Sequence, residues 1–212
     1  MSESIQSAIF TIGHSTHPQE RFIDLLKEHA ITAVCDVRSA PYSQFNPQFN
    51  REELGKVLPR QGIRYLFLGK ELGARSDDPA CYVRGKVQYS RIAQTEMFRS
   101  GLNRVVRGRR QGFRIALMCA EKEPLDCHRT ILVARYLTEL GLPVEHIHAD
   151  GQLESHDAAL GRLARTFNLP EGDMFHTRGE FLADAYSRQE ERIAFEAAAE
   201  AANGATLKGV MG

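Results

Sequence analysis

The stretch Phe113-Arg-Ile-Ala-Leu-Met-Cys119 is the clearest apolar run in the chain, and it decides the fold class. It is too short for a core helix, and polar residues follow it from Glu121 onward, so it predicts a fully buried β-strand. Strands that are apolar along their whole length are typical of parallel sheets covered by helices on both faces.

Similar runs on either side predict four more strands, at residues 8–12, 32–37, 64–68 and 144–148. Between the strands, apolar residues recur at helical spacing. The predicted helices start near Pro18, span Arg51 to Leu58 and about Ser90 to Arg110, and run from Cys127 to a stop at Gly141. This alternation predicts a single α/β domain with a mostly parallel, Rossmann-like sheet in three layers.

The predicted α/β domain occupies residues 1–172, and residues 173–212 form a helical, partly flexible C-terminal extension. The Ala/Glu-rich stretch from Phe175 to about Asn203 predicts an exposed helix, and the end from Gly204 to Gly212 is expected to fray. The long stretches from Arg38 to Arg51 and from Gly69 to Lys86 are predicted to be irregular.

Composition narrows the class of protein. Of the 212 residues, 42% are hydrophobic and 25% are charged, as in folded globular proteins. The 27 basic residues balance 27 acidic ones, so the net charge gives no support for a general nucleic-acid coat protein, although a local basic patch stays open. We expect no membrane segment, no secretory signal and a cytoplasmic location, with all four cysteines as reduced thiols.

Polar residues follow the predicted strands at the edge where α/β proteins bind ligands. These strand-end groups are His14 and Ser15, then Asp36, Arg38 and Ser39, then Lys70 and Glu71, then Cys119 and Glu121, and lastly His148 and Asp150. Their convergence predicts an active site or an anion-binding site.

The segment from Cys119 to Arg129 is the most informative part of this edge. It leaves a buried strand and enters a helix at Cys127, where free backbone N–H groups and a neighbouring arginine lower the pKa of a thiol. Cys127 is therefore a candidate nucleophile, with Glu121 as an alternative reactive group and His14 as a proton carrier. The predicted substrate-binding residues are Ser15, Asp36, Arg38, Ser39, Cys119, His128, Arg129 and Asp150, with Arg38 and Arg129 holding an anion.

Each of these residues also has a structural interpretation. Asp126 or Cys127 would cap the helix, and Cys119 would be a small apolar core residue. His14 would be hydrogen-bonded within its turn. Asp36 and Arg38, on the same side of their strand, would form an ion pair.

Two other functional classes stay open. Zinc or iron could use several of Cys119, Cys127, His128, His146, His148 and His14, but their spacing matches no standard zinc pattern, so we assign neither metal ligands nor a cofactor. A non-catalytic nucleotide- or nucleic-acid-binding module could use the basic cluster of Arg99, Arg104, Arg107, Arg109, Arg110 and Arg114. The favoured interpretation of that cluster is a solvated helix face.

The same motifs carry a resemblance to a known family. The matching pieces are Thr11-Ile-Gly-His14-Ser15, Asp36-Val-Arg38-Ser39, Pro47-x-Phe49, Tyr65-x-x-Leu68-Gly69-x-x-Leu72-Gly73, Cys119-x-Glu121, Cys127-His128-Arg129 and His146-Ile147-x-x-Asp150-Gly151. In this order they resemble the DUF488 family, a domain of unknown function. The resemblance implies an α/β fold and points to the same polar residues, but it implies no particular reaction.

Overall fold

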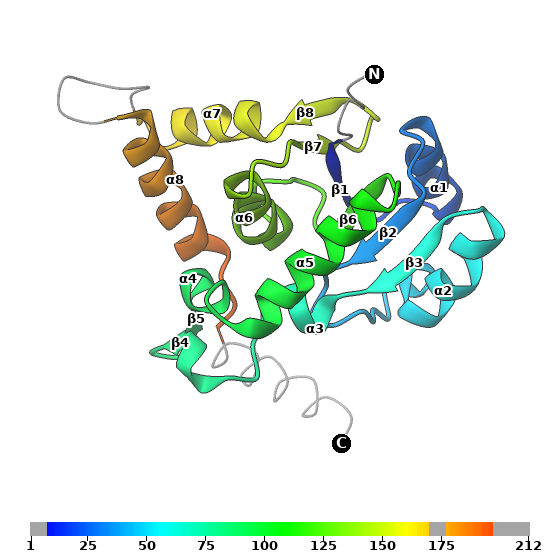
Figure 1. The fold of residues 1–212 in the computed structure, drawn as a ribbon, viewed down its shortest axis with the longest axis horizontal. Helices are drawn as coiled ribbons and strands as arrows, with labels where there is room; N and C mark the ends of the chain where they lie inside the picture. Colours follow the sequence, from blue (N-terminus) through cyan, green and yellow to red (C-terminus); the bar gives the residue numbers. More distant parts are fainter. Residues whose placement is uncertain (1–7, 170–176, 197–212) are drawn as a thin grey trace.

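A six-stranded sheet forms the centre of the computed structural model, which describes residues 8–169 and 177–196 (Figure 1). The strands lie in the order β3-β2-β6-β1-β7-β8, with bounds Arg64–Phe67, Ala33–Asp36, Ile115–Cys119, Ile9–Gly13, Val144–Ile147 and Leu153–Ser155. Neighbours among the first five strands are parallel, and β8 runs antiparallel to β7. The mostly parallel sheet predicted from the sequence is confirmed.

Helices cover both faces of the sheet, which confirms the three-layer α/β architecture. One face packs against α1 (Gln19–Glu28) and α2 (Arg51–Arg60). The other packs against α5 (Glu96–Arg110), α6 (Arg135–Glu139) and α7 (His156–Thr166). Along β6 the side chains alternate between the two cores, so Leu117 and Cys119 face the α5 and α6 layer.

Short elements fill the stretches that were predicted to be irregular. They are the 3₁₀ turns Pro47–Phe49 and Pro79–Cys81, the one-turn helix α3 (Gly69–Leu72), and the hairpin of β4 (Tyr82–Val83) and β5 (Lys86–Val87). Elements this short give no readable periodicity, which is why the sequence did not predict them. The single helix predicted from about Ser90 to Arg110 is divided in the structure into the one-turn helix α4 (Tyr89–Ile92) and α5.

The C-terminal helix α8 (Arg178–Ile193) begins at a capping box between Thr177 and Glu180. The prediction of an exposed helix is wrong for one of its faces, since Ala185 and Gln189 are buried. The Nε2 group of Gln189 donates to the main-chain oxygen of Leu125 at 2.9 Å, which ties α8 to the loop after β6. Residues 197–212, including the predicted frayed end, lie outside the described residues.

Among the described residues, no helix combines the length and the apolar character that crossing a membrane requires.

The register of the sheet brings three strand ends together. Cys119 on β6 pairs with Gly13 on β1, and Met118 pairs with Asp36 on β2. The segments that leave β1, β2 and β6 therefore lie side by side at one edge, as the strand-end argument requires.

Candidate active site

A pocket of about 270 Å³ lies where the chain leaves β2 and β6. Its lining includes six of the predicted site residues: Arg38, Ser39, Cys119, Glu121, Cys127 and His128. The other predicted residues, His14, Ser15, Asp36, Arg129 and Asp150, do not line it.

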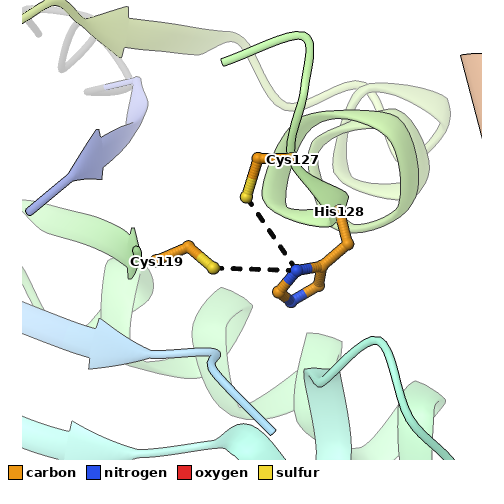
Figure 2. Close-up of side chains that lie close together, drawn as sticks. All are labelled: Cys119, Cys127 and His128. Atoms are coloured by element: carbon orange, nitrogen blue, oxygen red, sulfur yellow. Dashed lines mark hydrogen bonds between the residues drawn. The ribbon is translucent and has the colours of Figure 1, made fainter. Parts of the chain in front are cut away.

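Three side chains converge at the pocket (Figure 2). The Nδ1 atom of His128 lies 3.7 Å from the sulfur of Cys119 and 3.9 Å from the sulfur of Cys127. The Nε2 atom of His128 donates to the main-chain oxygen of Val37 at 2.9 Å. Because a carbonyl can only accept, this bond fixes the ring with Nδ1 toward both sulfurs.

Local structure explains why these residues meet. Cys119 ends β6 on the face that a π-helical segment, Arg129–Ala134, covers, and Cys127 and His128 come directly before that segment. All six residues of the π-helical segment are buried. It continues into α6, so the predicted helix from Cys127 to Gly141 is confirmed in outline.

The fully buried guanidinium of Arg129 anchors the loop between the two cysteines. It donates to the main-chain oxygens of Glu121 at 2.8 Å and Lys122 at 3.3 Å, while its Nε has no partner in the described structure. Gly13 allows this loop to approach β1, because a Cβ at Gly13 would overlap the oxygen of Glu121. The positive charge of Arg129 therefore lies just behind the cysteines.

The Cys127 thiol donates to a carboxylate oxygen of Glu121 at 2.9 Å. Burial alone would raise the pKa of Cys127, but hydrogen bonding to Cys119 and the charge of Arg129 lower it below its usual range. Burial and the neighbouring Cys127 raise the pKa of Glu121. Burial also raises the pKa of Cys119.

His14, Asp36 and Arg38 form a closed polar network behind the pocket, and of these three only Arg38 also lines it. Arg38 donates to both carboxylate oxygens of Asp36, at 2.9 and 2.7 Å, and to the main-chain oxygen of Phe49. Tyr65 donates to the same carboxylate. The predicted ion pair is therefore present, and most of the donor capacity of Arg38 is used within the protein.

His14 belongs to this network. Its Nε2 accepts from Arg38 at 3.0 Å, and its Nδ1 donates to the oxygen of Ser15 at 2.8 Å. Burial and the charge of Arg38 lower the pKa of His14 to about 4. Because both ring nitrogens are engaged, His14 holds the turn in the arrangement that the structural interpretation predicts.

Asp150, His146 and His148 also have partners away from the pocket. Asp150 accepts from the main-chain nitrogen of Gln152 and closes a turn. His148 contacts Glu154, and His146 lies between Thr11 and His156 in a buried chain. Of the histidines considered as metal ligands, only His128 lies beside the two cysteines.

The arginine cluster on and after α5 has partly structural roles. Arg104 pairs with Glu71, and Arg114 stacks over Phe10 while donating to the oxygen of His29. For these two arginines the structure shows packing and hydrogen-bonding roles, whereas the sequence predicted a solvated helix face.

Eight of the fourteen pocket residues were not predicted as site residues, and the three with large side chains capable of recognition are Arg75, Tyr89 and Phe195. They come from stretches predicted to be loop or exposed helix, and long-range packing brings them to the site. Phe195 is held there by its main-chain oxygen, which accepts from Val87, and by the guanidinium of Arg75, 4.1 Å from its ring centroid.

Comparison with known proteins identifies one family. The family model described as "Domain of unknown function DUF488" matches residues 18–137, which include β2, β6 and the whole Cys119–Arg129 segment. No curated protein and no solved structure gives a significant match.

Proposed function

The chain belongs to the DUF488 family, and we propose that it is an enzyme whose active site is the pocket at the ends of β2 and β6. The observation that carries the proposal is the convergence of Cys119, Cys127, His128 and Glu121 on this pocket. Buried polar side chains that meet in a pocket at the strand ends of an α/β sheet are typical of reactive sites.

An anionic, phosphate-bearing substrate suits the charges around this pocket. Arg129 is fully buried, and its guanidinium donates to the main-chain oxygens of Glu121 and Lys122, which carry no net charge. Its charge favours negative groups in front of it. Arg75 is a cation that lines the pocket, and we propose that its guanidinium binds the anion there.

In this proposal Cys127 or a group bound to it reacts with the substrate, and Glu121 carries the proton. The end of α8 contributes Ile193 and Phe195 to the pocket wall. The four cysteines are free thiols, which suits the reducing conditions of the cytoplasm.

The proposal is tested by binding and by turnover. Binding of inorganic phosphate and of adenosine monophosphate is measured by calorimetry, and turnover is measured with p-nitrophenyl phosphate, bis(p-nitrophenyl) phosphate and p-nitrophenyl acetate. We expect Arg75→Gln to weaken binding about tenfold, as the loss of one charge-assisted contact should. Arg110→Gln, at the far end of α5, is the matched control and should bind normally.

Cys127→Ser and Glu121→Gln should each abolish turnover while the circular dichroism spectrum stays that of the wild type. The proposal fails if the wild-type chain neither binds either phosphate compound nor turns over any of the three substrates.

A further inference from the structure

We propose that Cys119, Cys127 and His128 bind one divalent transition-metal ion, with Zn²⁺ as the ion that best suits their donor atoms. The inference rests on the active site proposed above and names its cofactor. Two thiolates and one imidazole form a donor set that zinc enzymes use when a fourth position is kept for water or substrate.

The distances between the donor atoms agree with this assignment. Zinc lies about 2.3 Å from sulfur and about 2.0 Å from nitrogen, so tetrahedral geometry places sulfur and nitrogen about 3.6 Å apart. The two separations from Nδ1 of His128 are 3.7 and 3.9 Å, and all three donor atoms lie within 4.8 Å of one another. An ion can therefore enter with only small movements of the side chains.

The surroundings of His128 are those of a metal ligand. Its Nε2–H group donates to the carbonyl of Val37, which leaves the lone pair of Nδ1 directed at the space between the sulfurs. Metal-binding histidines are usually oriented by such a bond from their second nitrogen. The buried π-helical segment that follows His128 fixes the backbone from which the ring projects.

A bound cation also explains why two cysteines lie side by side next to a carboxyl group. Two thiolates neutralise a divalent ion, whereas without the ion they would repel one another and Glu121. An ion bound to the Cys127 sulfur would replace the hydrogen bond from this thiol to Glu121, so the carboxylate would be available to a water molecule on the ion.

Cys119, Cys127 and His128 all line the 270 Å³ pocket, so an ion that they held would be open to it on one side. A water molecule bound there would pass a proton to Glu121 and attack an electrophilic atom of the anionic substrate as hydroxide. The bond to the leaving group breaks, and Glu121 returns the proton to that group. The reaction class is therefore hydrolytic.

The test uses the full chain and two measurements that do not depend on activity. Elemental analysis after dialysis should find one zinc per chain. Replacement by Co²⁺ should give the thiolate-to-metal charge-transfer band and the intense visible bands of tetrahedral sulfur-containing sites. Cys119→Ser, Cys127→Ser and His128→Gln should each weaken Zn²⁺ binding at least tenfold, in the range that loss of a ligand or its support produces.

Cys81→Ala is the matched control, because Cys81 is equally buried but lies outside the cluster, and it should retain the metal. The Co²⁺ spectrum of the wild type decides the matter even if a ligand variant fails to fold. The inference is overturned if the wild type binds neither Zn²⁺ nor Co²⁺ at micromolar concentration, or if the Co²⁺ spectrum lacks the sulfur band.

The two proposals fail in different ways. If no metal binds but Cys127→Ser abolishes turnover, the enzyme proposal stands with Cys127 as the nucleophile. If the metal binds through the three residues but no phosphate compound binds and no substrate is turned over, the metal inference stands and the enzyme proposal fails.

Discussion

The ring of His128 joins two segments that are far apart in the chain, because its Nε2 donates to the main-chain oxygen of Val37 at 2.9 Å. Val37 directly follows β2, and His128 precedes the π-helical segment after β6. The bond therefore fixes one wall of the pocket against the other, and it does so independently of any metal.

His128→Ala should destabilise the fold more than His128→Gln. The glutamine amide can still donate toward the Val37 carbonyl, whereas alanine leaves this buried oxygen without its partner, at a cost of about 1–2 kcal/mol. Urea unfolding in the presence of a chelator measures the difference. Equal free energies of unfolding would show that the bond to Val37 contributes nothing.

Asp36→Asn should be strongly destabilising. Asp36 is fully buried and neutralises Arg38, so the substitution leaves an uncompensated charge at a cost of about 3–5 kcal/mol. Glu53→Gln is the control, because Glu53 pairs with Lys56 on the surface and its loss should cost less than about 1 kcal/mol. A similar loss of stability for both variants would contradict the role assigned to Asp36.

Stability should fall as the pH falls from 6.5 toward 4. Burial lowers the pKa of both His14 and His156 from 6.5 to about 4 in the folded chain, so in this window the unfolded chain binds more protons. The neutral rings contribute their full stabilisation above pH 6.5. As the pH falls to 4, each histidine loses on the order of 2–3 kcal/mol of its contribution to the free energy of unfolding.

Urea titrations at several pH values between 7 and 4 measure the slope of the free energy of unfolding against pH. His156→Gln should flatten it, since one of the histidines with a lowered pKa no longer takes up a proton on unfolding. An unchanged slope in the variant would contradict a neutral, buried His156.

Gly13→Ala should disturb the site loop, because the new methyl group would overlap the main-chain oxygen of Glu121. We expect a loss of about 1–3 kcal/mol in stability, as for other overpacked positions, together with weaker Zn²⁺ binding. Gly161→Ala is the matched control inside α7, where the nearest atom is 3.7 Å away, and it should leave stability unchanged or raise it by up to about 1 kcal/mol.

The central part of the fold could be predicted because each parallel strand is apolar along its length. Both faces of β6 are buried, so the apolar run from Phe113 to Cys119 predicts a strand by itself. Strand β8 lies at the edge of the sheet with Leu153 partly exposed, and α7 follows it directly. Neither was predicted, because an edge strand of three residues carries too few buried positions to show a pattern.

The candidate site was predictable only in part, for a geometric reason. Cys127 and His128 lie at a helix start, which the sequence indicates, but Cys119 reaches them from the end of a strand. Spacing rules for zinc sites describe ligands from one compact loop, so they do not detect a ligand set divided in this way. Arg75 and Phe195 reach the pocket because segments distant in the sequence pack together. No local sequence pattern predicts this packing.

The family motifs are of two kinds, because some of their residues form the closed network of His14, Asp36, Arg38 and Phe49 and others line the pocket. One kind maintains the scaffold, and the other, around Cys119 and Cys127, carries the proposed chemistry. A family member with the scaffold motifs but without these cysteines should therefore fold in the same way and lack the metal centre. Under the proposed function such proteins would lack activity, and membership of the family alone would not identify them.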